Sequence, residues 1–208
     1  MSGDPQQPRH FSMIRGFHLA DAFTLANAAC GMTAVLLAMK YVGSGTLADF
    51  LLAAALAPAA LLFDVLDGRV ARHFGTHSAL GRELDSLADV ISFGVAPAAL
   101  AYAAGLRGGW DVVVLIFFVC CGVSRLARYN VTAEALAGGA AKVRYFEGTP
   151  IPTSVVLTAL LAWGAYDAKI GAALAAWKIG PWELHPWVLA FALSGTLMIS
   201  KTLRIPKI

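Results

Sequence analysis

Four aspartates lie in two pairs within a chain that is otherwise strongly apolar. Asp64 and Asp67 are three residues apart, and Asp85 and Asp89 are four residues apart. On a helix, residues at either spacing project from the same face. A short basic turn separates the two pairs, so two neighbouring helices can bring all four carboxylates together. We therefore expect a site at which these side chains converge.

A divalent cation is the simplest partner for such a cluster. A charged side chain within a bilayer is costly and is rarely left unpaired. Carboxylate oxygens suit Mg²⁺, Mn²⁺ or Ca²⁺ better than zinc, which prefers nitrogen and sulfur ligands. Four carboxylates exceed what one Mg²⁺ usually recruits, so we expect two ions that share a bridging aspartate. The predicted metal ligands are Asp64, Asp67, Asp85 and Asp89.

The residues between the acids indicate what else the site binds. Three small residues fall on or beside the helix faces that carry the acids and leave space there: Gly68, Ala71 and Gly81. Three nearby arginines offer donors to phosphate oxygens: Arg69, Arg72 and Arg82. Metal ions, arginines and cleared space together predict a pyrophosphate pocket. The alternative is that the Asp and Arg residues only pair with one another in a loop, while the glycines serve helix packing.

Composition places this site in a membrane protein. Of the 208 residues, 58% are hydrophobic and 14% are charged, whereas a soluble domain is about half apolar and about a quarter charged. We expect an all-α integral membrane protein that forms a single domain over residues 1–208. Its surroundings should be the lipid bilayer, and we expect no nucleic acid partner.

Six apolar stretches are long enough to cross the hydrocarbon core, which takes about 20 residues in a helix. They are residues 20–42, 46–66, 83–105, 110–129, 151–175 and 185–203. Ahead of them lies the N-terminal segment 1–18. Its residues 8–18 mix hydrophobic and basic side chains, which predicts either a short interfacial helix or a disordered tail.

Charge placement predicts the orientation of these spans. With six spans both termini share a side, and all of the 16 Lys and Arg residues fall on that side except Lys40, Arg107, Lys169 and Lys178. The positive-inside rule then places the termini and the aspartates on the cytoplasmic face of a cell (inner) membrane. Several of these arginines also belong to the expected site, so the charge bias has more than one cause.

The whole pattern of acids and small residues resembles the signature of a known family. Asp64-x2-Asp67-Gly68-x2-Ala71-Arg72-x8-Gly81-x3-Asp85-x3-Asp89 is similar to the signature of the CDP-alcohol phosphotransferases, and no position departs from it. The resemblance covers essentially the whole chain. It implies a divalent-metal enzyme that displaces CMP from a CDP-linked substrate by means of an alcohol nucleophile.

Four flanking segments resemble the membrane-embedded phosphatidylserine synthases within that family. They are TLANAACG (24–31), LDSLADVISFGVAPA (84–98), SRLARYN (124–130) and FEGTPIP (146–152). This likeness implies CDP-diacylglycerol and L-serine as substrates, and a homodimer. Another alcohol acceptor, such as inositol phosphate or glycerol 3-phosphate, and an archaeol-based lipid both stay open.

The resemblance also implies roles for individual residues. Asp64, Asp67 and Asp85 would hold the metals, and Asp89 would add a ligand and act as the catalytic base. The CDP moiety would be seated by residues of the signature and of the first span: Gly68, Ala71, Arg72, Gly81, Thr24, Asn27 and, in the turn, Ser78.

The acceptor needs groups that recognise its α-carboxylate and ammonium. Arg125, Arg128 and Asn130 end the fourth span on the same face as the acids, and arginine binds a carboxylate in bidentate fashion. Lys142 and Arg144 in the following loop are alternatives, and either group could bind lipid phosphate instead. A third interpretation is that 124–130 is only a basic helix end that follows the orientation rule.

Two other function classes share some of these features. Intramembrane prenyltransferases also use paired Asp-rich motifs and Mg²⁺, but they usually need more spans and lack the Gly68–Ala71–Arg72 pattern. An ion or proton carrier would use intramembrane acids as a relay. The acids of this chain instead cluster on one face and do not recur along a path through the other spans.

Overall fold

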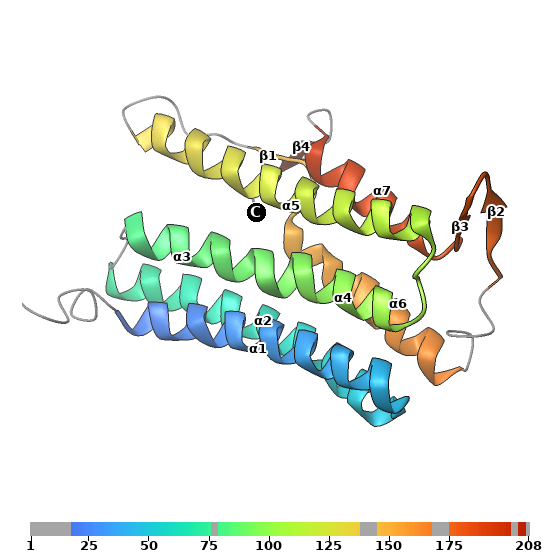
Figure 1. Ribbon diagram of the computed structural model, residues 1–208. Helices are drawn as coiled ribbons and strands as arrows, with labels where there is room; N and C mark the ends of the chain where they lie inside the picture. The colour runs from blue at the N-terminus through green and yellow to red at the C-terminus, as the bar shows by residue number, and fades with distance from the viewer. Residues whose placement is uncertain (1–17, 76–78, 138–144, 168–174, 201–203, 207–208) are drawn as a thin grey trace, which may run out of the picture.

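The computed structural model describes residues 18–75, 79–137, 145–167, 175–200 and 204–206, most of which are helical (Figure 1). The helices are α1 (Leu19–Ser44), α2 (Leu47–Phe74), α3 (Ala79–Asp89), α4 (Ala96–Ala103), α5 (Gly109–Ala137), α6 (Val155–Tyr166) and α7 (Val188–Ile199). A π-helical segment, η2 (Val90–Val95), joins α3 to α4, and a 3-10 turn, η3 (Ile151–Ser154), precedes α6.

The helices pack side by side as a bundle. α1 and α2 form an antiparallel hairpin, and the continuous rod of α3, η2 and α4 packs against α1. α5 packs with α7, and α6 contacts α2 and α4. One end of the bundle therefore collects the start of α1, the end of α2, the start of α3 and the end of α5 (Figure 1). The predicted site residues within the described ranges lie toward this end.

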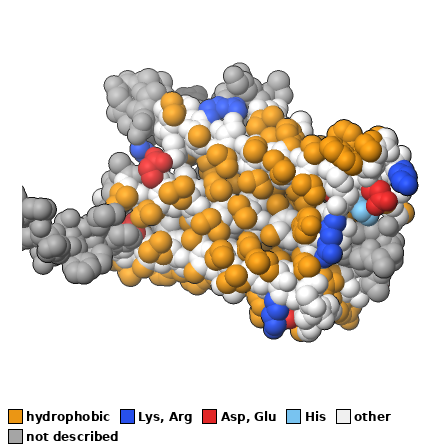
Figure 2. All heavy atoms as spheres, viewed as in Figure 1, with side chains coloured by type: hydrophobic (Ala, Val, Ile, Leu, Met, Phe, Trp, Pro, Cys, Tyr) orange, Lys and Arg blue, Asp and Glu red, His pale blue; other side chains and the backbone are white. Residues whose placement is uncertain are grey.

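The predicted all-α membrane architecture is confirmed. Among the described residues, four helices are long and apolar enough to cross a membrane: Leu19–Ser44, Leu47–Phe74, Leu80–Ala103 and Gly109–Thr132. Figure 2 shows hydrophobic side chains over most of the visible face, with charged ones mainly toward its two ends. The fifth and sixth predicted spans are represented by shorter apolar helices, Ile151–Tyr166 and Val188–Ile199. The count of six spans stays a prediction.

Two helices extend beyond the predicted spans at the end that carries the acids. We expected the second span to end near residue 66 and the third to begin near residue 83, whereas the helix α2 continues to Phe74 and α3 begins at Ala79. A span is only the part of a helix that lies in the hydrocarbon, so these span boundaries stay predictions. All four aspartates lie on helices. The expected interfacial helix at 8–18 falls almost wholly outside the described residues.

Two short antiparallel strand pairs, absent from the sequence prediction, accompany the helices. β1 (Tyr145–Glu147) pairs with β4 (Arg204–Pro206), and β2 (Trp177–Ile179) pairs with β3 (Trp182–Leu184). The β2–β3 hairpin lies at the end of the bundle opposite the acids (Figure 1). The buried carboxylate of Asp111 ties it to α5, because it accepts hydrogen bonds of 2.8 Å from the backbone N–H groups of both Gly108 and His185.

α1 turns one narrow face toward the bundle. Residues buried on this face recur at alternating steps of four and three: Ala20, Thr24, Asn27, Gly31, Ala34 and Ala38. The outer face is also apolar, with Leu25, Met32 and Leu36 about half exposed, as expected for a helix that faces lipid. Small residues let helix backbones approach closely in a membrane. The buried polar residues of α1, Asp21, Thr24 and Asn27, all lie in its first half, toward the end that carries the acids.

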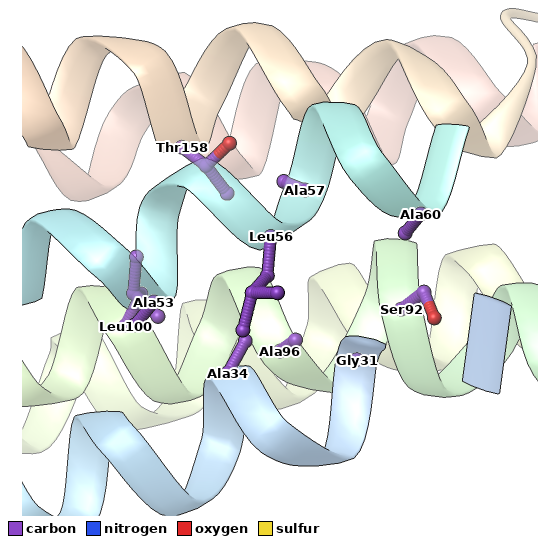
Figure 3. Close-up of a pocket in the computed structure, with 10 residues that line it drawn as sticks. All are labelled: Gly31, Ala34, Ala53, Leu56, Ala57, Ala60, Ser92, Ala96, Leu100 and Thr158. Atoms are coloured by element: carbon purple, nitrogen blue, oxygen red, sulfur yellow. The ribbon is translucent and has the colours of Figure 1, made fainter. Parts of the chain in front are cut away.

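A tight contact between helices brings Gly31 of α1 against Ser92 of η2. A Cβ at position 31 would lie 2.6 Å from the Cα of Ser92, so a larger residue would force the two segments apart. The Ser92 hydroxyl donates to the carbonyl oxygen of Asn27 at 2.8 Å. Next to this contact is a small pocket lined mainly by alanines, with Gly31, Ser92 and Thr158 at its walls (Figure 3). None of the four acids lines this pocket.

The Gly31 contact yields a test of the packing. Gly31→Ala should lower the free energy of unfolding by about 1–3 kcal/mol, the usual cost of overpacking a tight contact. Gly43→Ala is the matched control in the same helix, because nothing lies within 4 Å of a Cβ there. Thermal unfolding in detergent measures both variants. Equal melting temperatures for Gly31→Ala and the control would contradict the packing described here.

Candidate metal and phosphate site

Three of the predicted acids meet between α2 and α3. Asp64 and Asp67 on α2 and Asp85 on α3 each present a carboxylate oxygen, and these oxygens lie within 4.8 Å of one another. α2 ends at Gly75, which has a left-handed backbone (φ 65°) and donates its N–H to the carbonyl of Ala71. Glycine adopts this conformation without steric cost. The helix therefore stops cleanly, and the chain can return as α3 beside it.

The electrostatics of this cluster favour a bound cation. Two like charges about 4 Å apart repel by roughly 4 kcal/mol at an effective dielectric constant of about 20. Asp67 is only 6% exposed, so water screens the cluster poorly. The buried Oδ1 of Asp85 has no hydrogen-bond partner among the described residues. An all-oxygen donor set with an unused buried oxygen fits a hard divalent cation such as Mg²⁺ or Mn²⁺.

α1 holds two of the aspartates from the side. The Thr24 hydroxyl donates to Asp67 Oδ2 at 2.7 Å, and the Asn27 side-chain amide donates to Asp89 Oδ1 at 3.2 Å. Asn27 is fully buried, and its backbone carbonyl accepts a hydrogen bond from the Ser92 hydroxyl. We expected Thr24 and Asn27 to contact the nucleotide. In the structure they orient carboxylates, and a nucleotide contact by either residue stays a prediction.

Asp89 occupies a different position from the other three acids. Among the described residues, the group that could hold a metal comprises Asp64, Asp67 and Asp85, and Asp89 is not part of it. Its carboxylate is 7% exposed and lies one turn deeper in the bundle, next to the π-helical segment. π-Helical turns occur frequently at functional sites. The predicted ligand role of Asp89 is therefore untested, and its position suits a separate task.

The small residues of the signature lie on the two helices that carry the acids. Arg72, one turn after Gly68, places its guanidinium over that glycine, because a Cβ on Gly68 would lie 3.5 Å from Arg72 Nη1. Gly68 thus leaves space between the acids and an exposed arginine. Ala71 is on the same turn of α2, and Gly81 lies one turn before Asp85 on α3. Ser78 lies outside the described residues, and binding of CDP by the other four stays a prediction.

The predicted acceptor residues divide into two groups. Arg125, Arg128 and Asn130 lie in the second half of α5, the helix whose end meets the start of α3 at one end of the bundle (Figure 1). Arg125 interacts electrostatically with Asp89, and its buried Nε has no hydrogen-bond partner among the described residues. Asn130 is buried and bonds to α3 instead. Lys142 and Arg144 fall outside the described residues.

Sequence reasoning missed two further polar groups at this end. Asp21 is buried and interacts electrostatically with Asp67, and it accepts the backbone N–H of His18 at 2.7 Å at the start of α1. Its position three residues before Thr24 on one helix face was a usable signal. Glu83 and Ser86 on α3 bond to Asn130. No local sequence pattern predicts this pair, because the partner lies more than forty residues away.

Comparison with known proteins adds independent information. A family model described as CDP-alcohol phosphatidyltransferase matches residues 17–197. The CDP-diacylglycerol–serine O-phosphatidyltransferase of Saccharomyces cerevisiae is 42% identical over 206 residues, which cover 95% of this chain and 74% of the yeast protein.

For two prokaryotic relatives, the match covers a smaller share of the relative's own chain. The protein of the same name from Mycobacterium leprae is 35% identical over 93% of this chain and 59% of the relative. The archaetidylserine synthase of Methanothermobacter thermautotrophicus is 37% identical over 74% of this chain and 62% of the relative. The chain therefore spans about three fifths of the length of each of these two proteins.

The hydrogen bond from Thr24 to Asp67 yields a test of the site. Thr24→Val keeps the shape of the side chain and removes the donor, so Asp67 should be held less firmly. Loss of such a supporting contact typically weakens metal affinity by roughly 10–100-fold. Titration of Mn²⁺ into the detergent-solubilised protein, followed by electron paramagnetic resonance, measures this affinity. Thr33→Val, on the exposed face of α1, is the control, and equal Mn²⁺ affinity in both variants would contradict the supporting role.

Proposed function

Because the chain belongs to the CDP-alcohol phosphatidyltransferase family, we propose that it transfers a phosphatidyl group from CDP-diacylglycerol to the hydroxyl of L-serine and releases CMP. The observation that carries the chemistry is the convergence of the Asp64, Asp67 and Asp85 carboxylates beside Gly68 and Arg72. The choice of serine is supported by the yeast and mycobacterial relatives, both of which are named CDP-diacylglycerol–serine O-phosphatidyltransferase.

The end of α2 is the proposed seat of the CDP pyrophosphate. Asp64, Asp67 and Asp85 would hold Mg²⁺ or Mn²⁺, which when bound neutralises the charge that develops on the phosphates as CMP leaves. The space left by Gly68 admits the nucleotide close to the helix backbone. Arg72 lies over that space and can donate hydrogen bonds to phosphate oxygens.

Asp89 is the proposed general base. In the reaction, serine Oγ forms a bond to the lipid-side phosphorus, and the bond from that phosphorus to the bridging oxygen breaks, so that CMP leaves with the electron pair. The serine hydroxyl proton needs an acceptor within hydrogen-bond reach. The Asp89 carboxylate, held by Asn27 and outside the metal group, can accept it while the other three acids remain ligands.

The acceptor is proposed to enter between α3 and α5. Arg125 interacts electrostatically with Asp89, and its partly buried guanidinium can bind the serine carboxylate and place the hydroxyl near the base. We favour Arg125 over Arg128 for this role because its Nε is buried without a hydrogen-bond partner among the described residues. The other basic residues could then bind lipid phosphate or contribute to the orientation of the protein in the membrane. They are Arg128, Lys142 and Arg144.

The lengths of the helices support a site at the edge of the bilayer. α2 has 28 residues, or about 42 Å at 1.5 Å per residue, whereas the hydrocarbon core is about 30 Å thick. Asp64 and Asp67 lie in the second half of α2, where the helix would leave the hydrocarbon. Acyl chains could then remain in the bilayer while the CDP group meets the acids. Charge placement favours the cytoplasmic side of a cell membrane, and a homodimer stays a prediction.

An acceptor screen tests the proposed function. Purified protein with CDP-diacylglycerol and Mg²⁺ or Mn²⁺ should release CMP when L-serine is supplied, and less with inositol phosphate, glycerol 3-phosphate or choline. Addition of EDTA should stop the release. CDP-archaeol in place of CDP-diacylglycerol tests the lipid, since one relative is an archaetidylserine synthase. CMP release with another alcohol and none with serine would overturn the choice of acceptor, and release of pyrophosphate would indicate prenyl transfer.

If Asp89 is the base, its replacement should lower the turnover rate and leave metal affinity largely unchanged. Asp89→Asn removes the proton acceptor and should lower kcat by about 10²–10⁴-fold. Because Asp64, Asp67 and Asp85 are untouched, Mn²⁺ affinity should change much less. Steady-state CMP release and Mn²⁺ titration of the same preparation measure the two effects. Turnover within a few-fold of the wild-type rate would exclude Asp89 as the base.

A further inference from the structure

We propose that Glu83 binds the α-ammonium group of the acceptor and thereby makes the enzyme prefer an amino acid to a hydroxy acid. This inference rests on the proposed function, since it concerns the acceptor of the same reaction. The metal ligands and the base account for the phosphate and the hydroxyl, and an arginine accounts for the carboxylate. A zwitterionic acceptor also presents a positive charge, which requires an anion that the metal does not use.

Glu83 lies on a different face of α3 from the metal ligand Asp85. The Asn130 side-chain amide on α5 lies 3.4 Å and 3.3 Å from the two carboxylate oxygens of Glu83, and 3.0 Å from the Ser86 hydroxyl. Asn130 is only 9% exposed, so its amide is held firmly. The carboxylate of Glu83 is consequently fixed at the junction of α3 and α5, on the side of the proposed acceptor entrance.

Glu83 retains capacity for a further ligand. Its side chain is 56% exposed, and the Nε of the neighbouring Arg82 lies 4.0 Å from Glu83 Oε1. A carboxylate offers about four acceptor positions, and Asn130 supplies a single amide group. The Glu83 carboxylate is therefore oriented by the protein on one side and accessible from the other, unlike the buried Asp67 and Asp89.

The charged side chains around the junction of α3 and α5 complement the charges of an amino acid. Arg125 and Asn130 are five residues apart on α5, and Glu83 and Asp89 are six residues apart on α3. Arg125 and Asp89 lie at the deeper level and interact electrostatically, while Asn130 and Glu83 lie nearer the end of the bundle. An acceptor between the two helices would meet a cation, a base and an anion, which match carboxylate, hydroxyl and ammonium.

A variant that removes only the charge of Glu83 distinguishes ammonium binding from a purely structural role between α3 and α5. Glu83→Gln keeps an oxygen that accepts the Asn130 amide, so the tie between α3 and α5 survives while the negative charge is lost. Two acceptors are compared, L-serine and 3-hydroxypropionate, which has the hydroxyl and carboxylate but no ammonium. The KM for serine should rise about tenfold or more, as expected for loss of a charged hydrogen bond. The preference for serine over 3-hydroxypropionate in kcat/KM should fall by a similar factor.

Two further variants complete the experiment. Glu183→Gln, on the exposed β3 strand at the other end of the bundle, should behave as the wild type. Glu83→Asp keeps the charge and should recover part of the preference. If 3-hydroxypropionate is turned over too slowly, its inhibition constant against serine replaces its KM.

The outcomes are distinguishable. A serine KM within twofold of wild type in Glu83→Gln, or an equal loss for both acceptors, would overturn the ammonium site. Failure of the proposed function would instead appear in the wild-type protein, as absence of serine-dependent CMP release.

Discussion

Asp64, Asp67 and Asp85 repel one another, and much of the surrounding structure can be understood as what keeps them together. Two of the carboxylates come from α2 and the third from α3, so the helices must stay in register despite this repulsion. A bound divalent cation turns the repulsion into attraction. The protein contributes a rigid frame, in which the left-handed Gly75 ends α2 and α1 packs along the helices that carry the acids.

α1 is the element that couples packing to chemistry. Gly31 lets α1 approach the π-helical segment so closely that Ser92 reaches the backbone of Asn27. The same Asn27 orients Asp89, and Thr24 one turn earlier orients Asp67. One helix face thus fixes two acids that belong to different helices. Helix packing by small residues and placement of the Asp67 and Asp89 carboxylates are therefore one structural feature.

Much of this arrangement was predictable from the sequence. The spacings of the aspartates indicated a shared helix face, and composition indicated a membrane bundle. Hydropathy does not locate the ends of these helices, because the acids and glycines lower it while the backbone of α2 and α3 stays helical through them. The π-helical turn and the Asn130–Glu83 contact have no local signature. They arise from packing between helices far apart in the sequence, and only the structure reveals them.

The central claim is that Asp64, Asp67 and Asp85 form one divalent-cation site. Its most direct test is Mn²⁺ binding by electron paramagnetic resonance, in detergent and without substrate, so that catalysis does not enter. We expect Asp85→Asn to bind Mn²⁺ at least about tenfold more weakly than the wild type, because one ligand is lost. Asp167→Asn, at the exposed end of α6, should bind as the wild type does. Unchanged Mn²⁺ affinity in Asp85→Asn would contradict the account.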